Sequence, residues 1–368
     1  MSDKQLQKAG DNSCQLQAEN VYIANGITEQ RVREICSEMA VQAIAQNSLE
    51  ANSVAMQRID RFVDLLLPRI QRIEKDFDSF SEPAFQVLLR KAQLTSACTE
   101  RDCDYNILSE LLAHRINNKS DIKKKASIVK AVEIIDQVDD DSLCAITTYH
   151  AVMTFVPLSG NISNGIRTLS DLYEKINPDL LPKNETWMDN LSILGAITTI
   201  PFSSVPKLEE VLTKMLDGYV CVGIKKDGED YLKAIDLLKT NGIGTAILVD
   251  NELLEGYVRL ELNSKNSVED LSYSTKIMVN GQQQTVHRSL DDEQRKCLYD
   301  IFDLYSKDSQ LKERVDTNFR NLLNTFEPIS KISSWLNGLS IRFRTTSIGR
   351  VIAHANAKRI DNTLPDID

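Results

Sequence analysis

Apolar residues recur at intervals of three and four along most of the chain, which predicts a mainly α-helical protein. Between residues 28 and 157 the pattern predicts helices at 28–44, 53–77 and 83–93, and three more within 105–155. Pro68 lies inside the second of these runs and is expected to kink or interrupt it. We therefore predict a bundle of amphipathic helices in this part of the chain.

A different pattern precedes the first helix, in the stretch DNSCQLQAENVYIANG at residues 11–26. Apolar and polar residues alternate there, with a break at 19–20, as in two short strands or one kinked strand. Its Asn and Gln side chains can form amide ladders between identical strands in register. We expect strand-mediated self-association, an arm packed on its own protomer, or a disordered tail. The residues expected to self-associate are Cys14, Gln15, Leu16, Gln17, Val21 and Ile23.

The clearest break in the chain is the stretch PLSGN at residues 157–161, which predicts a domain boundary. We expect a leader at 1–27, a helical domain at 28–157 and a mainly helical domain with minor β structure at 158–368. In the last domain the pattern predicts helical segments at 169–176, 187–200, 205–224, 231–239, 291–305, 311–326 and 347–360. It predicts strands at 246–249, 257–262, 276–279 and 341–343, with a hairpin turn at 280–281.

Composition and charge narrow the classes of function. The 368 residues are 42% hydrophobic and 26% charged, and the net charge is −10 with a pI near 5.1. A chain of this charge lacks the overall cationic field that non-specific binding to nucleic acid or anionic membranes needs. Seven cysteines, odd in number and scattered, suit a reducing compartment. With neither a signal peptide nor a long apolar segment, the sequence predicts a cytoplasmic protein without a membrane partner.

Motifs for catalysis and cofactor binding are not found in the sequence. It has no phosphate-binding glycine loop, and the segment GNISNG at 160–165 does not match a nucleophile elbow. Cys98 and Cys103 resemble half of a zinc site, but no second ligand pair follows. The chain is more consistent with a non-enzyme, and no cofactor, metal or catalytic residue is predicted.

A basic segment near the C-terminus is the best candidate for nucleic-acid contact. Between residues 340 and 360 five side chains are basic and none is acidic. In a helix over 347–360, Arg350, His354 and Lys358 share one face, opposite an apolar stripe at residues 348, 351, 352 and 355. The preceding strand and this helix suggest a winged-helix-like element that contacts phosphates. The favoured interpretation is a docked terminal helix with a solvated basic face.

The leader also carries a resemblance. Its segments GDNS at 10–13, QLQA at 15–18, VYI at 21–23 and NGI at 25–27 resemble the leader of a set of uncharacterised bacterial proteins. The segment TTSIG at 345–349, followed by VIA at 351–353, resembles the closing motif of those proteins. Several members are encoded near mobile-element or antiphage-defence genes. The resemblance implies a role in antiphage defence, but no catalytic residue.

The sequence thus predicts a non-enzymatic cytoplasmic sensor, adaptor or scaffold protein that forms a homo-oligomer and has a role in bacterial antiphage defence. The alternatives are a nucleic-acid-binding regulator that uses the C-terminal helix, and an enzyme whose site is assembled from residues distant in sequence.

Overall fold

A computed structural model describes residues 27–44, 49–118, 121–279 and 282–367 of the chain. It confirms the mainly helical class with small antiparallel sheets. The predicted strand-like leader, with the self-association residues between Cys14 and Ile23, lies outside the described residues. Among the described helices, none combines the length and apolar character needed to cross a membrane.

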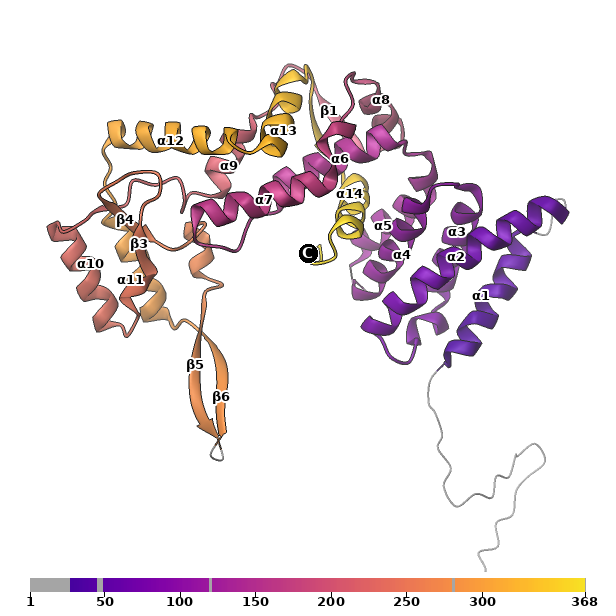
Figure 1. Cartoon of the computed structure of the whole chain (residues 1–368). Coiled ribbons are helices and arrows are strands. Elements are labelled where there is room, and N and C mark those ends of the chain that lie inside the picture. Colours follow the sequence, from indigo (N-terminus) through magenta and orange to yellow (C-terminus); the bar gives the residue numbers. More distant parts are fainter. Residues whose placement is uncertain (1–26, 45–48, 119–120, 280–281, 368) are drawn as a thin grey trace, which may run out of the picture.

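Helices from the first part of the chain form a bundle at one end of the molecule (Figure 1). Thr28 caps the first helix, which the sequence predicts from residue 28: its hydroxyl accepts a hydrogen bond from the backbone N–H of Arg31 at 3.2 Å. The expected interruption at Pro68 is wrong, since one helix continues through it. The helices are α1 (Glu29–Ile44), α2 (Leu49–Ile73), α3 (Pro83–Cys98), α4 (Asp102–Asn117), α5 (Ile122–Ile134) and α6 (Asp140–Thr154).

The last helix of the chain, α14 (Ser347–Ile360), returns to this bundle and packs against α4, α5 and α6. Its bounds match the predicted range 347–360. Thr346 caps it by accepting a hydrogen bond from the N–H of Gly349 at 3.2 Å and donating one to the carbonyl of Gly195 at 2.7 Å. A side chain at Gly349 would collide with the backbone of Ala196, so the glycine permits this close approach.

A second group of helices runs from the bundle to the other end of the molecule (Figure 1). The predicted helical segment at 187–200 is partly wrong, because its second half turns at 194–196 into a strand that pairs antiparallel with residues 342–345. A helix at 327–338 was not predicted. These elements are α7 (Ile162–Ile176), α8 (Thr186–Ile193), β1 (Ile197–Ile200), α9 (Leu208–Met215), α12 (Ser309–Asn324), α13 (Glu327–Gly338) and β7 (Arg342–Thr345).

A small αβ unit lies at the far end, with strand order β2-β4-β3. Its strands are β2 (Ile224–Lys225), β3 (Leu248–Asp250) and β4 (Tyr257–Leu260), and its helices are α10 (Glu229–Thr240) and α11 (Asp292–Asp303). The predicted hairpin is confirmed by β5 (Ser272–Val279) and β6 (Gln282–Ser289), which extend away from the body (Figure 1). Its turn, at 280–281, lies outside the described residues.

Two clusters of buried apolar side chains hold these parts together. The larger runs from Val32 to Ala357 and includes residues of the bundle, the second helical group and α14. The smaller lies in the αβ unit, between Ile224 and Ile301. The predicted boundary near residue 157 stays a prediction, and residues from both sides of it contribute to the larger cluster.

Candidate functional site

Three of the four histidines of the chain converge where α4, α5, α6 and α14 meet. They are His114 on α4, His150 on α6 and His354 on α14. The segment that follows α14, residues 361–367, folds back over them and is called the closing segment here. Two cavities, of about 580 and 170 Å³, flank it, and both are lined by His114, His354 and Asp366. We call this arrangement the histidine cavity.

A hydrogen-bonded chain through two of these histidines has a defined direction. The carbonyl oxygen of Pro365 only accepts, so the Nε2 of His354, 3.0 Å away, donates to it. A neutral His354 then accepts at Nδ1 from the Nε2 of His150 at 3.1 Å. The Nδ1 of His150 in turn accepts from the hydroxyl of Thr154 at 3.2 Å. With both imidazoles neutral, every polar atom of both rings is paired.

Burial keeps these rings neutral. It lowers the pKa of His150 to about 4, with further lowering by the nearby charges of His354 and Arg350. It likewise lowers the pKa of His114 to about 4, where the positive charges of His354 and Lys124 act in the same direction. The pKa of His354 is lowered by burial, although its bond to Pro365 opposes that shift. The three imidazoles are thus neutral hydrogen-bond donors and acceptors that lie close to positively charged side chains.

Cations border the larger cavity from two helices. Lys123 and Lys124 lie in the first turn of α5, and Arg350 lies in the first turn of α14. None of these three side chains forms an ion pair within the described part of the chain. Asp366, in the closing segment, is the one acidic side chain among the described residues that line this cavity. The cavity therefore carries an excess of positive charge.

Lys358 is held differently. Its ammonium group pairs with the carboxylate of Asp366 and lies 3.5 Å from the carboxylate of Glu110 on α4. Glu110 also pairs with Arg69 of α2 at 3.3 Å. The pKa of Asp366 is lowered by its hydrogen bond to Lys358. These pairs fasten the closing segment to the bundle.

The structure brings the predicted residues Arg350, His354 and Lys358 together at this site, but not as a solvated face. Only Arg350 is exposed, since His354 is 4% exposed and Lys358 is paired with carboxylates. The expected single apolar stripe is wrong, because Ala353, Asn356 and Ala357 are buried as well. The periodicity did not predict this, because α14 is surrounded by three helices. Nucleic-acid contact through α14 stays a prediction.

The sequence did not indicate that His114, His150 and the Lys123–Lys124 pair belong to the same site. A lysine pair of this kind is common on the solvated face of a helix. His150 lies 36 residues after His114 and 204 residues before His354 in the sequence. Within the described ranges, no group of three or more His, Cys, Asp or Glu side chains is placed to hold a metal ion. The three histidines are therefore not arranged as a metal centre in that part of the chain.

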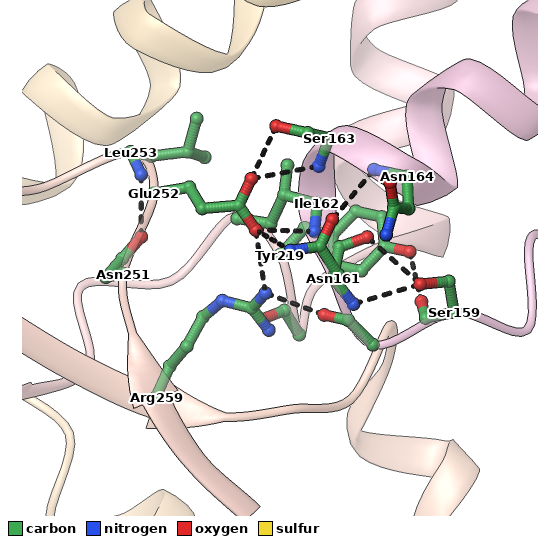
Figure 2. Close-up of polar contacts among 12 residues, drawn as sticks. Ser159, Asn161, Ile162, Ser163, Asn164, Tyr219, Asn251, Glu252, Leu253 and Arg259 are labelled. Carbon is green, nitrogen blue, oxygen red and sulfur yellow. Dashed lines mark hydrogen bonds and ion pairs between the residues drawn. The ribbon is translucent and has the colours of Figure 1, made fainter.

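A second polar cluster, centred on the buried Arg259, joins α7 to the αβ unit (Figure 2). The carboxylate of Glu252 accepts hydrogen bonds from the backbone N–H groups of Ile162 at 2.9 Å and Ser163 at 3.0 Å, at the N-terminus of α7. Arg259, fully buried, donates to the carbonyls of Gly160 at 2.6 Å and Leu260 at 2.9 Å. We call this the Arg259 junction. The segment 160–165, considered above as a nucleophile elbow, is the capped start of α7.

The fold and this site define a helical protein with a buried, histidine-lined cavity. A protein-family model with the description ":-like" matches residues 26–367, and the chain belongs to that family. Comparison with curated proteins and with solved structures gave no match. Since the family description gives neither an activity nor a ligand, the function is argued from the site.

Proposed function

We propose that the protein is a non-enzymatic, cytoplasmic sensor or adaptor that binds an anionic ligand in the histidine cavity and self-assembles. One observation carries the ligand part: Lys123, Lys124 and Arg350 border one cavity without ion-pair partners in the described structure. A pocket with convergent polar groups and side chains of shifted pKa is a typical ligand-binding site. Cations without ion-pair partners at its border favour an anionic ligand.

Assembly is proposed from the leader, whose alternating pattern and amide side chains favour pairing between copies. The resemblance of the leader and of the segment 345–353 to bacterial proteins encoded near defence genes supports a role in antiphage defence. Ligand binding near α14 and assembly through the leader would then be the input and the output of one sensor.

Two measurements test these parts separately. Isothermal titration calorimetry of the full chain should detect binding of inorganic phosphate at constant ionic strength, and Lys124→Gln should weaken it. Light scattering should show that the full chain has a larger mass than a chain lacking residues 1–26. Equal masses would remove the leader from the proposal, and heat signals equal to those of dilution into buffer alone would remove the anion site.

A second candidate function, hydrolysis of a phosphate ester, is favoured by one contact. The Thr154 hydroxyl donates to the Nδ1 of His150, which in turn is held by His354. A hydroxyl on a neutral imidazole with an oriented second partner is the arrangement that activates nucleophiles. Turnover of p-nitrophenyl phosphate that Thr154→Val abolishes would establish it, and the absence of turnover in the parent chain would exclude it for this ester.

A further inference from the structure

Building on the proposed anion site, the geometry points to a small organic phosphate monoester as its ligand and to the closing segment as an intramolecular competitor for it. The closing segment already places two acceptors on donors of the site. The carbonyl of Pro365 accepts from His354 at 3.0 Å, and the carboxylate of Asp366 pairs with Lys358. These are the contacts that oxygens of a bound anion would make.

The charge balance favours a dianion over a carboxylate. Lys123, Lys124 and Arg350 remain without a partner while Asp366 supplies a single negative charge to the cavity. A phosphate monoester carries between one and a half and about two negative charges near neutral pH and offers three acceptor oxygens. It can therefore replace the Asp366 carboxylate and also engage the cations that the segment leaves unpaired.

The size and lining of the cavity favour an organic group beside the phosphate. The larger cavity, at about 580 Å³, falls in the range of small-molecule pockets and is much larger than a phosphate ion. Phe155 and Val351 provide an apolar wall next to the charged groups. The ring of Phe155 packs edge-on against His150, with centroids 5.5 Å apart. An aromatic or sugar ring attached to the phosphate would lie against this wall.

Competition follows from the position of the closing segment. Asp366 and Ile367 line both cavities, so the segment separates them. The segment is attached by the His354 and Lys358 contacts, by the packing of Leu364 against the larger apolar cluster, and by an ion pair from Asp361 to Lys175 of α7 at 2.7 Å. A phosphate that takes over the contacts of His354 and Lys358 leaves the segment held only by Leu364 and Asp361. Ligand binding thus loosens residues 362–367.

The test combines calorimetry with hydrogen exchange on the full chain, with phenyl phosphate as the probe and inorganic phosphate and acetate as comparison anions. Asp366→Asn removes the competing charge and should lower the dissociation constant of phenyl phosphate by about tenfold. Asp300→Asn, an exposed change of the same kind on α11, is the control and should leave the affinity unchanged. In the parent chain, phenyl phosphate should speed amide exchange in residues 362–367.

The outcomes separate the inference from the proposed function. Phosphate binding with unchanged exchange in residues 362–367 would overturn the competition and leave the anion site standing. Acetate binding as tightly as phenyl phosphate would overturn the ligand class. If neither the parent nor Asp366→Asn binds any of the three anions, the anion site and the inference built on it are both wrong. If inorganic phosphate binds as tightly as phenyl phosphate, the site does not recognise an organic group, and only that part of the inference is wrong.

Discussion

The Arg259 junction and the histidine cavity are both polar clusters around buried side chains that join distant parts of the chain. They differ in the source of the groups that pair with their charges. At the junction, the guanidinium of Arg259 faces backbone carbonyls and the Glu252 carboxylate faces the start of a helix (Figure 2). At the cavity, cations border open space and one acidic side chain comes from a returning segment. A buried guanidinium that donates mainly to backbone carbonyls stabilises the fold, whereas cations without ion-pair partners beside a cavity are available to a ligand.

The largest expected effect tests the structural side of this comparison. Replacing Arg259 by Met removes the guanidinium donors of the Gly160 and Leu262 carbonyls, whereas the Leu260 carbonyl keeps the backbone N–H of Leu262. Unpaired buried groups of this kind cost about 3–5 kcal/mol of unfolding free energy. Urea unfolding followed by tryptophan fluorescence measures this loss.

Arg342→Met is the matched control, because Arg342 is an exposed arginine that bonds only to the Ser203 hydroxyl, at 3.1 Å. Its expected change is within about 0.5 kcal/mol. Equal losses in the two variants would show that the buried guanidinium adds no special stability.

The next effect is the pH dependence that the buried histidines of the cavity add to stability. The pKa of His150 is lowered to about 4 in the folded protein, below its ordinary value of 6.5. The unfolded chain therefore binds the proton first as the pH falls, and stability present above about pH 6.5 is lost towards pH 4. For this buried side chain the loss is roughly 3 kcal/mol. The charged and titratable groups that line the same cavity are His114, His354, Lys123, Lys124, Arg350 and Asp366.

Urea unfolding of the parent and of His150→Gln across this range isolates the contribution of His150. The parent should lose more stability on acidification than the variant, because glutamine can donate to His354 without gaining a proton. Parallel curves would mean that His150 is as easily protonated in the folded protein as in the unfolded chain.

A smaller effect concerns ligand affinity and its dependence on pH. A bound anion raises the pKa of the nearby histidines, but the pKa values of His114 and His150 start near 4, so these rings stay neutral above about pH 7. Between about pH 8 and pH 7, where a phosphate monoester stays mostly dianionic, we therefore expect the affinity of phenyl phosphate to change by less than about twofold. Calorimetry in two buffers with different ionisation enthalpies should detect no proton uptake in this range. Measurable uptake there would mean that the bound anion brings the pKa of a histidine close to neutrality.

Removing single cations from the cavity should separate binding from stability. Arg350→Gln is expected to weaken phenyl phosphate binding by about fivefold, the size of one charge-assisted contact. The unfolding free energy should change by less than about 0.5 kcal/mol, since this exposed side chain has no ion pair in the described structure. If Arg350→Gln lowers both the affinity and the unfolding free energy, Arg350 stabilises the fold and its effect on binding is indirect.

The sequence predicted local features of the fold well and the site only in part. The predicted range 347–360 is helical throughout, and Thr28 caps the helix predicted to begin there, because caps and amphipathic periods depend on neighbours in the chain. The burial of His354 was missed, since it depends on α4 and α6 wrapping the far side of α14. The strand at Ile197–Ile200 was missed because its partner, residues 342–345, is 145 residues away.

The last prediction concerns the nucleic-acid alternative, and we expect the smallest effect there. The ammonium of Lys358 is already paired with Asp366 and Glu110, and His354 is buried and neutral, so α14 presents only Arg350 of the three predicted residues to a phosphate backbone. One cation contributes little to duplex binding, whose affinity grows with the number of neutralised phosphates. A gel shift at low salt should therefore show no retarded band with double-stranded DNA. A band that salt weakens, and that Arg344→Glu with Arg350→Glu removes, would instead make β7 and the start of α14 a nucleic-acid interface.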